Sequence, residues 1–307
     1  MGFPVKAVVA ALANAVNDGT AAVLEQRSTK QVSTRSNPLS VRLIIDLLRR
    51  PLWLIAIVLN ITGVILQIVA LHYGALALVQ PILVCDLIFA ALIGFAFRRQ
   101  WPDWEIMLGV LCCAGGLALF LVVARPHGGV ATVPPVDVIP LAIAYGAALA
   151  GCLLVAATGP QMLRPIMLAL ACGISYGVTA FVLKLLSGGW AGGLSQLPYQ
   201  WPLYAAVVVG PLGFLLNQSA YQAGILVSPV LAVITAVDPL VSIALAVGLL
   251  NETISGGALN ITLEAAALVV MIAGIVVLSH RAPHVVDQAK AAAAARGQPV
   301  SAEEPLS

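Results

Sequence analysis

Short polar breaks divide the sequence into long apolar runs, and this pattern constrains the fold more than any other feature. A helix of about 20 apolar residues spans the roughly 30 Å hydrocarbon core of a bilayer. Nine runs reach about that length: 3–24, 52–72, 75–97, 105–124, 137–157, 165–186, 202–222, 226–250 and 261–280. Only 9% of the 307 residues are charged, whereas about a quarter are charged in a soluble domain. The sequence therefore predicts an all-α, polytopic membrane protein with about nine transmembrane helices.

The basic residues are distributed unevenly over the loops between these runs. If the loop after the first run is cytoplasmic, three of the 15 Lys and Arg residues lie outside and the other 12 lie inside; the three are Lys6, Arg125 and Lys184. An excess of Lys and Arg marks cytoplasmic loops. We therefore expect a multi-pass protein of the plasma (inner) membrane. Its N-terminus would be outside and its C-terminus cytoplasmic, with a flexible cytoplasmic tail at 281–307.

Two aspartates lie at the centres of apolar runs: Asp86 in 75–97 and Asp238 in 226–250. An isolated carboxylate there costs at least ~3 kcal/mol on insertion scales, so each must face a partner, water or a ligand, or stay protonated. We predict that the pair binds a substrate, or couples transport to protons or a cation, and serves as metal ligands if that cation is divalent. The alternative is that they lock helices together through hydrogen bonds. Proline interrupts helical hydrogen bonding and can therefore act as a hinge. The same runs contain three candidate hinges: Pro81, Pro229 and Pro239.

The first run has a polar face. Asn14, Asn17 and Asp18 are spaced i, i+3 and i+4, which places them on one side of a helix. This face must look inward, where it offers oxygen ligands or a polar seam for helix packing. Three uncharged residues are candidates for the same cavity: Gln67, Asn217 and Gln218. Three others lie nearer to the ends of their runs and are expected in solvated positions: His72, Glu252 and Glu264.

An internal repeat relates the two halves of the chain. Residues 73–83 align with 221–231, and residues 12–19 align with 170–177. Runs one to four thus resemble runs six to nine. Corresponding runs are five spans apart, and because five is an odd number the two copies cross the membrane in opposite orientations. The expected units are a first repeat (1–124), a joining helix with its loops (125–164), a second, inverted repeat (165–280) and the tail.

One enzyme-like motif occurs within an apolar run. Gly173-Ile-Ser-Tyr-Gly177 matches G-x-S-x-G, but that motif acts on a strand-to-helix turn beside a histidine base. Here it lies within a predicted helix, and no histidine lies deep in any run. We therefore expect no enzyme, and we interpret the two glycines as a GxxxG surface for helix packing.

The motifs of both halves are similar to those of a known group. They are Ala70-Leu-His-Tyr and Ala77-Leu-Val-Gln-Pro, then Ala220-Tyr-Gln-Ala, and finally Val227-Ser-Pro through Asp238-Pro-Leu to Leu249-Leu-Asn-Glu252. The chain resembles the EamA-like drug/metabolite transporter superfamily over most of residues 3–280. Its nine runs, outside N-terminus and Pro51-Leu-Trp53 resemble the branch that contains NIPA-type magnesium transporters.

The sequence and this resemblance favour an alternating-access secondary transporter of a small polar metabolite or cation. Asp86 and Asp238 would be its central pair, with Asp18 as an auxiliary residue. One alternative is a magnesium or divalent-cation transporter that uses the same carboxylates. Another is a non-transporting membrane protein that assists envelope assembly. We expect no cofactor beyond coupling protons or cations. The expected partners are the bilayer and a small-molecule or ion substrate, with a homodimer as an open alternative and no nucleic acid.

Overall fold

A computed structural model describes residues 4–30, 51–86, 88–90, 92–93, 104–124, 127–128, 133–160, 163–189, 198–223, 227–253, 262–274 and 277. Its helices are α1 (Val5–Lys30), α3 (Pro51–Tyr73), α4 (Leu76–Leu83), α6 (Trp104–Ala124), α7 (Pro135–Thr158), α8 (Arg164–Gly188), α9 (Trp201–Ala223) and α10 (Val227–Leu249), followed by a shorter helix, Thr262–Gly274. Two short strands, β1 (His127–Gly128) and β2 (Glu252–Thr253), pair antiparallel. The described chain is thus almost entirely helical.

Five helices of the described chain are long and apolar enough to cross a membrane. They are Val5–Leu24, Leu54–Tyr73, Val138–Thr158, Arg164–Gly188 and Trp201–Ala220. Large apolar side chains on several of these helices point outward; Ile143 is 67% exposed and Val208 66%. Outward-facing apolar side chains are what a lipid environment favours, because there they remain out of water. The helical content and the apolar exterior agree with the predicted all-α membrane protein.

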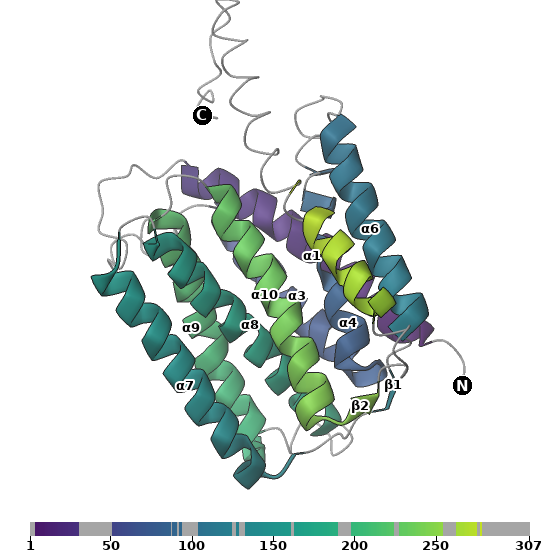
Figure 1. Ribbon diagram of the computed structural model, residues 1–307, viewed down its shortest axis with the longest axis vertical. Helices are drawn as coiled ribbons and strands as arrows, with labels where there is room; N and C mark the ends of the chain where they lie inside the picture. The colour runs from purple at the N-terminus through teal and green to yellow at the C-terminus, as the bar shows by residue number, and fades with distance from the viewer. Residues whose placement is uncertain are drawn as a thin grey trace, which may run out of the picture.

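Two groups of helices make up the bundle (Figure 1). α8 packs against α7, α9 and α10, while α1 packs against α3 and α4. The groups meet where α10 contacts α4 and where α8 contacts α3. α8 is the most enclosed long span, with 15 of its 25 residues buried, whereas α7 lies at the edge of the bundle and is mostly exposed. Side chains of both groups form one continuous core.

The helix that carries Asp86 is interrupted. α4 ends at Leu83, residues 84–85 form a turn, and helical backbone resumes at Asp86. In the turn the Cys85 amide donates to the Ile82 carbonyl at 3.0 Å, which is a tighter i to i−3 bond than an α-helix makes. Pro81, inside α4, has no amide to donate. The sequence predicted one span over 75–97, but the described part of it is a broken helix with Asp86 directly after the break.

The other two hinge candidates both lie in α10, in different positions. Pro229 is the third residue of the helix, in its first turn, where a missing amide leaves no gap in the hydrogen-bond pattern. Pro239 is inside the helix, directly after Asp238. Of these two prolines, Pro239 alone removes a helical hydrogen bond from α10. The tail at 281–307 lies outside the described residues.

Candidate functional site

The polar face of α1 lies against α3 at a glycine. Gly63 has no side chain, and Asn14 Oδ1 is 3.1 Å from the position that a Cβ atom on Gly63 would occupy. Asp18 Oδ1 is closer still to that position. The Asn17 Nδ2 donates to the Leu59 carbonyl at 2.8 Å and to Asp18 Oδ1 at 3.2 Å. The structure thus brings the three predicted residues of α1 together on α3.

Asn14 is buried without a hydrogen-bond partner. Its side chain is 1% exposed, and neither its oxygen nor its nitrogen is bonded within the described residues. A buried polar group without a partner costs about 1–3 kcal/mol. A polar side chain kept in such a place is therefore a candidate for contact with a ligand or water.

A second buried amide, Gln80, is not among the residues predicted from the sequence. It is 2% exposed and lies in α4, whose residues Leu76–Ile82 are all buried. Its Nε2 has no hydrogen-bond partner in the described chain. The signal that could have identified it is a glutamine directly before Pro81 in an otherwise apolar run.

The main chain at each central aspartate touches a glycine of another helix. A Cβ atom on Gly19 of α1 would lie 2.6 Å from the Asp86 carbonyl oxygen. One on Gly177 of α8 would lie 2.9 Å from the Asp238 carbonyl oxygen. The absence of side chains at Gly19 and Gly177 is what allows both close approaches. Each aspartate is thus fixed at a tight crossing of two helices.

Asp238 also lies next to the packing surface predicted from the GxxxG motif. A Cβ atom on Gly173 would lie 2.8 Å from Val237 Cβ, and one on Gly177 would lie 2.7 Å from Val241 Cβ. Both valines belong to α10, so α10 packs directly against the two glycines. The predicted packing role of the glycines is thus confirmed. On α10 itself the Ser242 hydroxyl donates to the Asp238 carbonyl, and it lies 3.3 Å from Asp238 Oδ1.

The polar positions of α8 repeat the arrangement on α1. Gly213 of α9 faces Ser175 and Tyr176, with its Cβ position 2.9 Å from the Tyr176 ring and 3.2 Å from Ser175 Cβ. The Cys172 thiol donates to the Gly213 carbonyl at 3.4 Å. In the alignment of residues 12–19 with 170–177, these three α8 residues correspond to the three polar residues of α1.

The remaining predicted residues lie on other helices. Gln67 is partly buried on α3, and Asn217 and Gln218 are partly buried on α9. Asn217 Oδ1 is a further polar atom without a hydrogen-bond partner in the described chain. The described residues contain no group of three or more His, Cys, Asp or Glu side chains that could hold a metal ion.

A buried ionic cluster, which the sequence did not predict, fixes the corner between α3 and α4. Glu252 accepts hydrogen bonds from the Leu76 amide at 2.6 Å and from the Ala77 amide at 2.9 Å. These amides begin α4 and have no partner within the helix. Glu252 is 3% exposed, so its predicted solvated position was wrong. The same prediction was wrong for Glu264, which is 9% exposed, whereas His72 is exposed.

Lys184 completes this cluster from α8. Its ammonium donates to the Leu71 carbonyl at 2.7 Å and to the Gly74 carbonyl at 2.6 Å, at the C-terminal end of α3. Its charge also interacts with that of Glu252. An anion at the N-terminus of one helix and a cation at the C-terminus of another both interact favourably with the helix dipoles. Two side chains from the second half thus hold the α3–α4 corner of the first.

Burial raises the pKa of Glu252, which lies beyond the end of α10. The Ala77 and Leu76 amides and the Lys184 charge act in the opposite direction, because they stabilise the carboxylate. The effect of burial is the larger. The cluster therefore holds an acid that takes up a proton more readily than a solvated glutamate.

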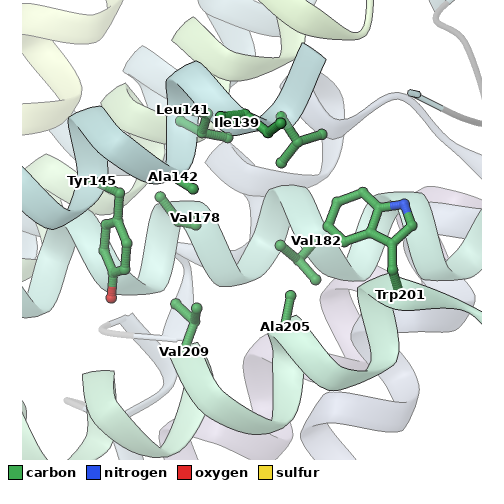
Figure 2. Close-up of a pocket in the computed structure, with 10 residues that line it drawn as sticks. Ile139, Leu141, Ala142, Tyr145, Val178, Val182, Trp201, Ala205 and Val209 are labelled. Atoms are coloured by element: carbon green, nitrogen blue, oxygen red, sulfur yellow. The ribbon is translucent and has the colours of Figure 1, made fainter. Parts of the chain in front are cut away.

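A pocket of about 340 Å³ lies between α7, α8 and α9. Figure 2 shows Tyr145 near one end of it and Trp201 near the other, with Val178, Val182 and Val209 between them. The Tyr145 hydroxyl pairs with Ser175 Oγ at 3.0 Å. The lining is almost entirely apolar, and it includes none of the predicted site residues. This pocket therefore offers almost no hydrogen-bonding group to a polar solute.

Comparison with known proteins shows that the chain is similar to a bacterial protein. The chain is 28% identical over 284 residues to a protein of Corynebacterium glutamicum that is described as uncharacterised. The match covers 89% of this chain and 94% of that protein. No family model and no solved structure matches the chain.

Proposed function

We propose that this chain is an alternating-access secondary transporter of the drug/metabolite type, which moves a small polar metabolite or cation across the plasma membrane. The observation that carries the proposal is the pair of equivalent crossings, Gly19 on Asp86 and Gly177 on Asp238. Acids inside membrane spans mark substrate, ion or proton pathways. Two of them at matching helix crossings are expected where a site lies between two related halves.

The glycine contacts support an inverted repeat within nine spans. Gly63 covers Asn17 and Asp18 of α1, and Gly213 covers the aligned residues Ser175 and Tyr176 of α8. Under the repeat, α1 and α3 correspond to α8 and α9, and α7 is the joining helix. The interruption at 84–85, directly before Asp86, adds support, because transporters bind substrates and ions at discontinuous helices.

Alternating access needs a barrier on one side of the site at a time. With the N-terminus outside, the α3–α4 corner, the end of α8 and residue 252 all lie on the outer side. Glu252 and Lys184 then close the outer end by joining the two halves. The cluster must therefore break whenever the outer side opens.

The test is transport by the full chain reconstituted in liposomes. Pools of amino acids, polyamines and nucleosides are added outside, while trapped pyranine reports proton movement and a trapped magnesium dye reports Mg²⁺. We expect proton-linked uptake of one pool, with a loss of at least tenfold in Asp86→Asn and in Asp238→Asn. Full activity in both variants would remove the central carboxylates from the mechanism.

Other results of this experiment identify the alternative functions. Mg²⁺ flux without proton movement would indicate the divalent-cation transporter. A folded protein that shows no flux under any gradient would indicate the non-transporting protein.

A further inference from the structure

We propose that a monovalent cation binds between α1 and α3, against Gly63, with Asn14 and Asp18 as its side-chain ligands. The inference deepens the proposed function, on which it rests for the role of this cation as a coupling ion alongside protons. It is carried by the buried amide of Asn14, which has no partner within the described chain.

The geometry directs two oxygen-bearing side chains at one place. Asn14 and Asp18 are one helical turn apart, so their side chains leave α1 on the same side. Asn14 Oδ1 and Asp18 Oδ1 both approach the position of the missing Cβ of Gly63. The α3 backbone can come this close to two polar groups because residue 63 carries no side chain.

Asn17 positions the carboxylate rather than competing for it. Its Nδ2 is held by the Leu59 carbonyl at 2.8 Å and lies 3.2 Å from Asp18 Oδ1. One amide hydrogen therefore ties the group to α3 while the other is directed at the carboxylate. This arrangement orients Asp18 before any ligand arrives, as a preorganised binding site requires.

Charge decides the class of ligand. Asp18 is the single acid of this group, and both ligand atoms are oxygens, which suit a hard cation. One carboxylate balances one positive charge, whereas a divalent ion would leave a buried excess charge. A monovalent metal ion is therefore the ligand that this group fits.

The experiment measures thermal unfolding of the purified full chain in detergent at constant ionic strength. NaCl and KCl are compared with choline chloride and with MgCl₂. A ligand that binds only the folded state raises the unfolding midpoint. We expect a saturable rise of about 3 °C or more with Na⁺ or K⁺ over choline. No rise with either ion, or a rise with Mg²⁺ alone, overturns the proposal.

Three variants locate the site. Asp18→Asn preserves shape and removes the charge, and Asn14→Ala removes the amide. Gly63→Ala places a methyl carbon too close to Asp18 Oδ1, so the carboxylate must move. All three should lose the cation-dependent rise, whereas Gly146→Ala should keep it, because nothing lies within 4 Å of the added carbon. If Gly63→Ala does not fold, Asp18→Asn decides, and an unchanged rise in that variant overturns the proposal.

This measurement does not depend on transport. Cation-specific stabilisation without flux in liposomes would support the site and remove the transport function. Flux without any cation-specific stabilisation would leave the transport function and remove the site.

Discussion

Replacement of Glu252 by alanine should destabilise the corner between α3 and α4. The substitution removes two acceptors, at 2.6 and 2.9 Å from the Leu76 and Ala77 amides, and leaves those buried amides without partners. A hydrogen bond to a charged group contributes about 1.5–3 kcal/mol, so two give roughly 3–6 kcal/mol. Burial of the carboxylate offsets part of this, as the raised pKa of Glu252 shows. We expect a net loss of about 2–4 kcal/mol in the free energy of unfolding.

The assay is reversible unfolding in mixed detergent micelles, combined with a double-mutant cycle. Glu252→Ala and Lys184→Met are measured singly and together, and their coupling free energy should be about 1–2 kcal/mol, because the two charges interact. Lys6→Met is the matched control: Lys6 is exposed and lies over Tyr73 at the same end of α3. Its effect should add to that of Glu252→Ala without coupling.

Two results would refute this reasoning. One is a loss for Glu252→Ala no larger than that for Lys6→Met, because two hydrogen bonds and a buried position predict far more. The other is zero coupling with Lys184, which would mean that the two side chains stabilise the corner independently.

Three other substitutions test the proton on Glu252, the glycine crossings and the central acid. Burial raises the pKa of Glu252 above its usual 4.5, so its contribution to stability is full below that value and declines as the pH rises through the raised pKa; Glu252→Gln should remove this part of the pH dependence of unfolding. Gly177→Ala forces a methyl group against Val241 and should cost about 1–3 kcal/mol, whereas Gly248→Ala, with nothing within 4 Å, should change stability by less than ~0.5 kcal/mol in the same assay. Asp238→Asn should abolish proton-linked uptake in liposomes and leave the elution volume of the purified protein unchanged; equal loss of folding would instead assign Asp238 to packing.

The parts of the fold that follow local rules were predictable from the sequence. Apolar runs of about 20 residues predicted long helices, because the thickness of a bilayer sets the length of the apolar segment that spans it. The spacing of Gly173 and Gly177 predicted a packing surface, because two small residues one turn apart leave a groove on a helix. The spacing of Asn14, Asn17 and Asp18 likewise placed them on one face, and the structure packs that face on α3.

The ionic cluster could not be predicted, because its partners are far apart in the chain. Glu252 binds amides 176 and 175 positions away, and Lys184 binds carbonyls 113 and 110 positions away. A position near the end of an apolar run indicates solvation only if no other segment covers it. Here the chain after α10 turns at Asn251, which has a positive φ of 51°, and lies against the α3–α4 corner. Lys184, a lysine within an apolar run, was the local signal that a buried partner existed.

The positions of the glycines separate rigid from movable contacts. Gly19, Gly63, Gly177 and Gly213 each bring two helices of the same half into close contact, and an inserted carbon atom would collide with backbone or side-chain atoms there. Such contacts resist sliding, because packed interiors are dense and poorly compressible.

Contacts between the halves differ in kind, because they include the Glu252 and Lys184 hydrogen bonds at one end of α3 and α4. Those bonds end on main-chain groups, which water can satisfy once the ends of the helices are exposed. The two halves also share an apolar core, so under the proposed alternating access the Glu252 and Lys184 hydrogen bonds are the exchangeable part of the contact between them. The corner at Glu252 is therefore where opening should begin.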